Sequence, residues 1–379
     1  MERIDLTESV SKPDSPRREL QKGGGGPWRR LLAKLLLLGI SCLVGFLLGE
    51  IVVRIVRPGF PGFRIPQVVH RPAPGIGFEM VPGQRAYTFA QPVTVNAYGC
   101  RGPELKTAGD AARTRILCLG DSLTFGVGVA DEQVYPRLIE AHFMDADRGT
   151  QTEVINAAVQ RYFTYQEMDW LRQKGLRLQP DVVILGVYAN DLGLRPAGDY
   201  VREYEKEREQ VASSLRRKAP WIYLVAKNSA LVELVKQSVR SWSASRNAVN
   251  LLEGRSKSWS EKRWEAMGQE LAAFAQLARQ YGFQPLVLAI PSRSQVGGND
   301  PGADYPAKLH GLCEQLGLPS VDFIAEFKES LAEGRDPYLR WDNHMSAVGH
   351  QLVAKRTQQA LQDLYINGSQ NPRKTDAMP

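Results

Sequence analysis

The pattern of apolar and polar positions divides the chain into one continuously apolar segment and a long region of alternating runs. Residues 31–53 are almost entirely apolar, and residues 35–49 contain no charged side chain. From about residue 114, short apolar runs alternate with longer stretches of helical periodicity. Strands that alternate with helices predict βαβ units, and therefore a parallel sheet with helices on both faces.

Five short apolar runs are predicted as strands, and five amphipathic stretches as helices. The third run contains only aliphatic residues and one glycine from Val182 to Val187, which is typical of a central strand buried on both faces. The predicted strands are residues 115–119, 153–156, 181–187, 285–290 and 320–323. The predicted helices are residues 134–144, 165–176, 259–281, 307–316 and 346–365. Together they predict one α/β domain over residues 111–366.

The apolar segment is predicted to be a single-pass transmembrane helix over residues 31–56. About 20 residues span the hydrocarbon core of a bilayer, so Lys34 and Glu50 would have to reach the headgroups. A cleaved signal peptide is the first alternative, but the following residues are charged and lack an Ala-x-Ala cleavage site. A buried soluble helix is the second alternative, and the apolar character on all sides of the segment disfavours it.

Basic residues on both flanks of this segment bear on its orientation. Six lie before or at its start and three after it: Arg17, Arg18, Lys22, Arg29, Arg30 and Lys34, against Arg54, Arg57 and Arg64. The positive-inside rule then places the N-terminus in the cytoplasm and the large C-terminal part outside it. In a bacterium, the chain would be anchored in the inner (cytoplasmic) membrane with its α/β domain in the periplasm.

The remaining segments complete the predicted domain organisation. Residues 1–30 are predicted to be a disordered cytoplasmic tail, and residues 367–379 a second disordered tail. Residues 57–110 are predicted to form a linker and a small β-rich lead-in. Residues 195–258 are predicted to be a helical insertion between the third and fourth strands.

Composition removes several classes of function. The net charge of +7 includes the basic flank of the apolar segment, so it gives no argument for nucleic acid binding. Four scattered cysteines without a CxxC pair argue against a disulfide scaffold and a zinc site. His70, His142 and His310 have no companions at metal-ligand spacing, so we expect no metal and no cofactor. Cys118 and His350 are predicted to be structural.

Three polar features follow or precede the predicted elements at positions where active sites of open α/β folds collect. Ser122 lies in a Gly-Asp-Ser-Leu turn after the first strand, although a serine there could simply cap a helix. Asn190 follows the third strand and could donate an amide N–H, or could form a turn with its neighbour. Asp342 and His344 form an Asp-x-His loop before the last helix, where they could act as a base and its orienting group, or lie in a surface loop.

The three features together, in the order Ser, Asn, Asp, His, resemble the SGNH hydrolase superfamily, also called the GDSL family, over about residues 90–365. A Ser-x-x-Gly-His start of the last helix adds to the resemblance, and the lead-in 95–102 is similar to membrane-anchored bacterial members. The resemblance implies a flavodoxin-like three-layer α/β/α sandwich. It further implies Ser122 as nucleophile, His344 as general base and Asp342 as its orienting group. The oxyanion hole would comprise the Ser122 N–H, the Asn190 side chain and a backbone N–H at Arg161.

Three positions depart from the family pattern. Arg161 stands where the family favours glycine, and its cationic side chain could narrow the pocket or bind an anionic or sugar substrate. Tyr188 also replaces a glycine. The Asp-x-His spacing is similar to that of relatives that transfer or remove acetyl groups on cell-surface polysaccharides. These departures bear on the substrate more than on the Ser-His-Asp chemistry.

The sequence therefore predicts a membrane-anchored serine esterase that removes ester-linked acyl groups, with acetyl groups of cell-surface glycans as the expected substrate. One alternative is an O-acyltransferase of polysaccharide, and another is a non-catalytic carbohydrate-binding or assembly protein on the same fold. The expected partners are an acyl ester or glycan and the membrane, with no nucleic acid. The sequence indicates no particular protein partner.

Overall fold

The computed structural model describes residues 26–60, 62–106, 113–146, 151–188, 191–195, 201, 218–239, 256–297 and 305–366. Most of both predicted tails, Asn190 and much of the predicted insertion lie outside these residues. The chain forms two compact units that divide between Val52 and Val53.

The apolar segment forms α1 (Pro27–Val56), which begins four residues before the predicted transmembrane start and includes the end of the predicted tail. Proline at the first helical position is favourable, because its missing N–H would have no intrahelical partner there. Its 30 residues give a length of about 45 Å, which exceeds the roughly 30 Å hydrocarbon core of a bilayer. Among the described residues this is the one helix long and apolar enough to cross a membrane, and it is equally compatible with an anchor or a signal sequence.

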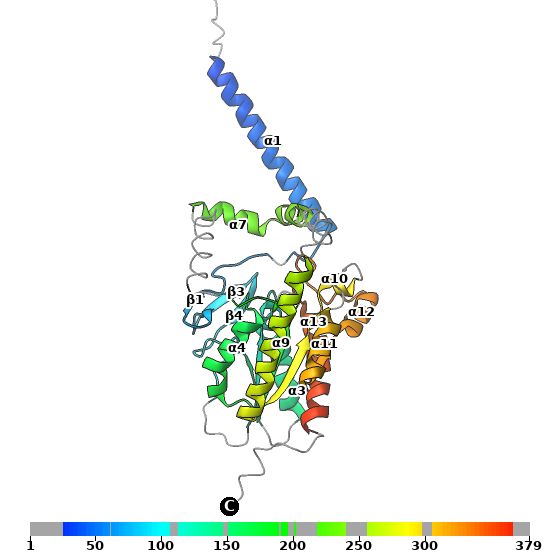
Figure 1. The fold of residues 1–379 in the computed structure, drawn as a ribbon. Helices are drawn as coiled ribbons and strands as arrows, with labels where there is room; N and C mark the ends of the chain where they lie inside the picture. Colours follow the sequence, from blue (N-terminus) through cyan, green and yellow to red (C-terminus); the bar gives the residue numbers. More distant parts are fainter. Residues whose placement is uncertain are drawn as a thin grey trace, which may run out of the picture. The chain divides into compact units, whose positions relative to one another are not determined.

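A five-stranded parallel sheet forms the centre of the second unit (Figure 1). Its strands are β5 (Arg113–Gly120), β6 (Gln151–Asn156), β7 (Val182–Val187), β8 (Gln284–Ala289) and β9 (Ser320–Asp322). The spatial order is β6-β5-β7-β8-β9, and every neighbouring pair is parallel. In chain order this is the flavodoxin-like arrangement 2-1-3-4-5. The five predicted strands are confirmed, with ends that differ by at most two residues.

Successive side chains of each strand enter two different apolar cores, because neighbouring residues of a strand face opposite sides of the sheet. On β5, Leu117 and Leu119 join one core, and Ile116 and Cys118 join the other. The first core is covered by α4 (Thr164–Gln173), α9 (Ser256–Tyr281) and α11 (Tyr305–Leu316). The second is covered by α3 (Tyr135–Ala146), α12 (Ile324–Ala332) and α13 (Ala347–Leu361). The predicted three-layer α/β/α sandwich is therefore confirmed, with α12 as an additional helix.

Short helices and turns connect these layers. They are α2 (Ser122–Phe125), α10 (Arg293–Val296), the 3₁₀ helices η1 (Asp131–Gln133) and η2 (Gly175–Leu178), and a π-helical turn, η4 (Gln362–Ile366), after α13. Between β7 and β8 the structure describes α7 (Pro220–Asn228) and a further helical stretch over residues 230–239.

Two antiparallel hairpins precede the sheet. They are β1 (His70–Ala73) with β2 (Gly77–Met80), and β3 (Arg85–Thr88) with β4 (Gln91–Thr94). Their buried side chains, among them Phe78, Met80 and Val93, belong to the first core of the sandwich. The chain then passes the end of β6, where Arg101 forms a backbone bridge with Asn156, before it enters β5. The hairpins therefore pack on the side of the sheet that carries the first core, and β2 reaches the C-terminal end of α4 through the ion pair between Glu79 and Lys174.

Candidate active site

Ser122 is the first residue of α2, directly after the carboxyl end of β5. Asp121 precedes it, and its Oδ1 atom accepts a hydrogen bond of 2.8 Å from the backbone N–H of Leu123. This local bond caps the helix. Because the first N–H groups of a helix have no intrahelical acceptor, the Ser122 N–H can donate to a group outside the helix.

Two glycines allow α2 to pack closely on the sheet. A Cβ atom on Gly120 would lie 2.2 Å from the Oγ1 atom of Thr124, and one on Gly186 would lie 2.3 Å from the same atom. Asn156 holds the turn from the other side, because its side-chain amide donates to the Thr124 carbonyl at 3.1 Å. The turn that carries Ser122 is thus fixed by β5, β7 and the end of β6.

His344 and Asp342 meet Ser122 from a loop 222 positions away in the chain. The Nε2 atom of His344 lies 2.9 Å from the Ser122 Oγ atom, and its Nδ1 atom is hydrogen-bonded to Oδ1 of Asp342. Asp342 also accepts the backbone N–H of His344 at 3.0 Å. Partial burial would raise the pKa of the Asp342 carboxyl, but the hydrogen bond and charge of His344 outweigh it and hold that pKa below its ordinary value.

The loop that carries this pair is fixed to the start of α13. Ser346 caps the helix by accepting the Gly349 N–H at 3.4 Å, and its hydroxyl donates to the Asp336 carbonyl at 2.8 Å. A Cβ atom on Gly349 would lie 2.2 Å from the carbonyl oxygen of Pro337. The Ser-x-x-Gly spacing in the sequence therefore reflects a close approach between α13 and the segment before His344.

Of the two other predicted oxyanion residues, the structure describes one. Asn190 lies outside the described residues. Arg161 has a φ of 74°, in the left-handed region that glycine adopts readily, which accounts for glycine at this position in the family pattern. Its guanidinium carbon lies 5.9 Å from the ring centre of Phe78, and Arg161 is not among the residues that line the cavity beside Ser122.

Comparison with known proteins gives the family. A family model described as the GDSL-like lipase/acylhydrolase family matches residues 118–352, well over half of the chain. The protein belongs to the GDSL-like lipase/acylhydrolase family. This match confirms the resemblance from which a serine hydrolase was predicted.

The solved structures that the chain resembles include TesA, with 16% identity over 66% of this chain and 99% of that chain and a TM-score of 0.41. An acetyl xylan esterase, AlAXEase, has 15% identity over 65% and 99% of the two chains and a TM-score of 0.41. A lipase/acylhydrolase from Enterococcus faecalis has 15% identity over 66% and 96%, with a TM-score of 0.40. An uncharacterized protein of Mycoplasma pneumoniae is 26% identical over 175 residues, which span 46% of this chain but 20% of that protein.

In this GDSL-family protein, a buried arginine that the sequence analysis did not single out fixes the far end of α2. Arg101 is 3% exposed, and its guanidinium donates to the carbonyls of Phe125, Gly126 and Val129 at 2.7, 2.6 and 2.7 Å. It also forms an ion pair of 2.8 Å with Asp131. The lead-in 95–102 therefore acts on the site through Arg101, which ties the segment after Ser122 to the hairpins.

The Ser122 hydroxyl opens into a cavity of about 540 Å³. Its described lining residues are Ser122, Leu123, Tyr188, Gln237, Arg293, Arg340, Trp341, Asp342, Asn343 and His344. Arg293 is paired with Asp336 at 3.1 Å, whereas Arg340 donates to the Pro58 carbonyl at 3.4 Å. Asp342 is the one carboxylate among these lining residues, and because Asp336 is paired with Arg293, the positive and negative charges of these described residues are close to balanced.

Two buried carboxyl groups lie behind this cavity. One oxygen of Asp191 accepts the Tyr188 N–H at 2.6 Å, and neither oxygen of Glu167 has a hydrogen-bond partner among the described residues. Burial raises the pKa values of Glu167 and Asp191 well above those of an ordinary Glu and Asp, and the negative charge of Asp121 raises both pKa values further. In the part of the chain that the structure describes, no group of three or more His, Cys, Asp or Glu side chains is arranged to hold a metal ion.

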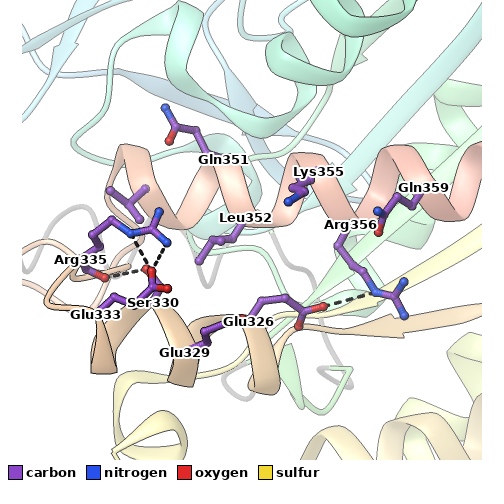
Figure 2. A pocket seen from close by; sticks show the side chains of 11 residues that line it. Glu326, Glu329, Ser330, Glu333, Arg335, Gln351, Leu352, Lys355, Arg356 and Gln359 are labelled. Atoms are coloured by element: carbon purple, nitrogen blue, oxygen red, sulfur yellow. Dashed lines mark hydrogen bonds and ion pairs between the residues drawn. The ribbon is translucent and has the colours of Figure 1, made fainter.

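A second cavity of about 470 Å³ lies between α12 and α13, and Figure 2 shows it from close by. An ion pair of 3.4 Å between Arg356 and Glu326 lies at one end, and a pair between Arg335 and Glu333 at the other (Figure 2). Of the described residues that line it, none is a histidine or a cysteine. This groove is a solvated surface of paired charges, and the candidate chemistry lies at the sheet edge.

Proposed function

We propose that the protein is a serine acylhydrolase that cleaves ester-linked acyl groups, with Ser122 as nucleophile. The observation that carries this proposal is the continuous chain of hydrogen bonds from Ser122 through His344 to Asp342. A hydroxyl, a base within hydrogen-bond reach and a carboxylate that orients the base are what nucleophilic serine chemistry requires. Their place at the carboxyl ends of parallel strands gives an acyl group access to the hydroxyl.

In the first half of the reaction, the Ser122 Oγ atom attacks the carbonyl carbon of the ester while His344 Nε2 takes its proton. Asp342 keeps the opposite N–H of the imidazole oriented and stabilises the imidazolium that forms. The Ser122 N–H and the Asn190 side chain are the proposed donors to the tetrahedral oxyanion. Collapse of this intermediate releases the alcohol, which takes the proton from His344. Water then attacks the acyl-enzyme and loses its proton to His344. When this second intermediate collapses, the bond between the acyl carbon and the Ser122 Oγ atom breaks, the carboxylic acid leaves, and His344 returns the proton to the Oγ atom.

The proposed setting is an anchored enzyme whose substrate is an acylated glycan outside the cytoplasm. The length and apolar character of α1 support an anchor, and the basic residues before it support a cytoplasmic N-terminus in the inner membrane. The amide and guanidinium donors of Gln237, Arg340 and Asn343 in the cavity fit an acceptor rich in hydroxyl and carbonyl oxygens. If a sugar hydroxyl attacks the acyl-enzyme in place of water, the acyl group is transferred to the sugar, and the protein is an O-acyltransferase.

The proposal is tested by acetyl-ester hydrolysis with full-length protein in detergent. Ser122→Ala and His344→Gln are each expected to lower kcat by about 10³–10⁶-fold at an unchanged melting temperature. Ser238→Ala is the matched control, because it removes an exposed hydroxyl that donates to the Leu234 carbonyl of its own helix. Unchanged turnover in Ser122→Ala would show that another group performs the chemistry. An added oligosaccharide acceptor distinguishes hydrolysis from transfer. Hydrolysis releases acetic acid, whereas transfer places the acetyl group on the oligosaccharide.

A further inference from the structure

The helices between β7 and β8 expose apolar side chains to an unusual extent. No residue of α7 is buried, and Trp221 and Val225, one turn apart on the same face, are 68% and 55% exposed. In the next helical stretch, Val235 and Val239 are also one turn apart and more than half exposed. Contiguous exposed apolar surface on a helix indicates an interaction surface. We name residues 220–239 the platform.

The platform is bound to the last turn of α1. Ala230 packs with Val53 in one apolar cluster, and the Arg54 guanidinium donates to the Asn228 carbonyl at 2.7 Å. The Asn228 side chain also accepts the Phe63 N–H at 2.8 Å and donates to the Phe63 carbonyl at 3.2 Å. Because Val53 and Arg54 end the apolar helix, the platform lies within a few residues of the point where the apolar segment stops.

Positive charge accompanies this apolar surface. No acidic residue occurs between Val53 and Val69, and Glu233 is the one acidic residue between Lys218 and Val239. The basic residues of these two stretches are Arg54, Arg57, Arg64, Lys218, Lys227 and Lys236. An apolar helix face accompanied by lysine and arginine is typical of helices that lie at the boundary between anionic headgroups and acyl chains.

We propose that the platform lies on the surface of the lipid bilayer in which α1 is anchored. The proposal depends on the proposed anchoring of α1. A bilayer fits better than a second copy of the chain, because the contacts of Ala230 and Asn228 with the last turn of α1 keep the platform beside the membrane in every copy. In this position the bilayer removes the apolar side chains of the platform from water, and no protein partner is needed to cover them.

One residue of the platform, Gln237, also lines the catalytic cavity, whereas Trp221 is not among the lining residues. The Gln237 side chain donates to the Trp341 carbonyl at 2.5 Å, and both residues line the cavity that contains Ser122. Trp341 packs edge-to-face on Phe60, with 5.4 Å between the ring centres. The cavity is therefore held next to the membrane surface, and the substrate class that it favours is an acyl ester presented at that surface, such as a lipid-linked acylated glycan.

The contact is tested by depth-dependent fluorescence quenching with full-length protein in lipid nanodiscs loaded with one chain each. A thiol-reactive, environment-sensitive fluorophore is attached to Trp221→Cys in a Cys42→Ser background, and the lipids carry nitroxide groups. We expect strong quenching at position 221, and none at the control Leu331→Cys, an exposed apolar position on α12. A fluorophore at Ile40→Cys in α1 reports on the anchor itself.

Quenching at Ile40→Cys without quenching at Trp221→Cys would overturn the platform while the anchor stands. Quenching at neither position would overturn both. A fluorophore at Trp221→Cys that is unquenched by the lipids, but whose emission shifts as in an apolar environment only in discs that hold two chains, would identify a second copy as the partner and refute the bilayer contact.

A second variant tests the consequence for substrate. Trp221→Glu is expected to lower hydrolysis of an acyl ester embedded in anionic vesicles by about tenfold, and to leave hydrolysis of a soluble acetyl ester unchanged. Equal rates on the embedded ester for the variant and the wild type would contradict the proposed substrate class. If the wild type hydrolyses neither ester, the proposed function fails, and the quenching experiment still decides the contact.

Discussion

Arg101 gives the sharpest test of how the fold positions the nucleophile. Arg101→Met keeps the length and apolar stem of the side chain but removes the guanidinium that binds three carbonyls after α2 and the Asp131 carboxylate. Removal of one partner from a buried ion pair costs about 3–5 kcal/mol. Because the Asp131 side chain is 20% exposed and can be rehydrated, we expect the lower end, about 3 kcal/mol. The melting temperature should then fall by roughly 6–12 °C.

The same substitution should affect catalysis beyond its effect on stability. The carbonyls of Phe125 and Gly126 follow Ser122 within one turn, so loss of their donors allows the hydroxyl to move relative to His344. A misplacement of about 1 Å at a reacting atom lowers rates by about 10²-fold. We expect kcat for an acetyl ester, measured well below the melting temperature, to fall by about 10- to 100-fold.

Two further variants control this experiment. Arg71→Met removes an ion pair with Glu79 at a side chain that is 53% exposed, and it should change stability by less than about 1 kcal/mol. Arg101→Lys should be intermediate, because one ammonium group cannot reach all four partners. If Arg101→Met has the same melting temperature and the same kcat as Arg71→Met, the buried guanidinium does not hold the turn that carries Ser122.

Three other substitutions test separate parts of the site. Glu167→Gln replaces a buried carboxyl whose raised pKa makes the folded state bind more protons than the unfolded state, so that wild-type stability falls as pH rises. The melting temperature of the wild type should therefore fall relative to that of this variant as the pH rises above about 5, and a constant difference between the two would refute the raised pKa of Glu167. Gly349→Ala places a Cβ atom 2.2 Å from the Pro337 carbonyl oxygen and should lower both stability and kcat. Its control is Gly311→Ala, where a Cβ atom has no neighbour within 4 Å, and which should be neutral or stabilising. Equal melting temperatures for the two variants would contradict the close approach. Asp342→Asn should lower kcat for an acetyl ester by about 10³–10⁴-fold with little change in melting temperature, and near-normal turnover would remove Asp342 from the mechanism.

The central sheet could be predicted because its strands are buried on both faces. Val182–Val187 contains no polar side chain, and such a run between turn-forming residues has few other interpretations. The helix α12 was missed because it begins directly after β9 at Phe323, whose side chain makes no capping hydrogen bond. The hairpin strands β1 and β4 have four residues each and contain Pro72 and Pro92, which weaken the sequence pattern of a strand.

The site could be predicted in part for a similar reason. Ser122 and the pair Asp342 and His344 each occupy a motif of distinctive residue types next to a predicted element. Arg101 has no such signal, because most of its partners are backbone carbonyls, which every residue carries. The sequence also could not show which surface Arg161 faces, since that depends on the position of Phe78 in the lead-in.

The central claim is that Ser122 carries the acyl group during turnover, and trapping of the acyl-enzyme tests it most directly. Full-length protein is mixed with an excess of an activated acetyl ester, quenched in acid before the steady state, digested, and analysed by mass spectrometry. We predict one acetyl group on the peptide that contains Ser122, and none on the corresponding peptide of Ser122→Ala. Ester hydrolysis with the acetyl group on another residue, or with no acetylated peptide at any quench time, would contradict the account.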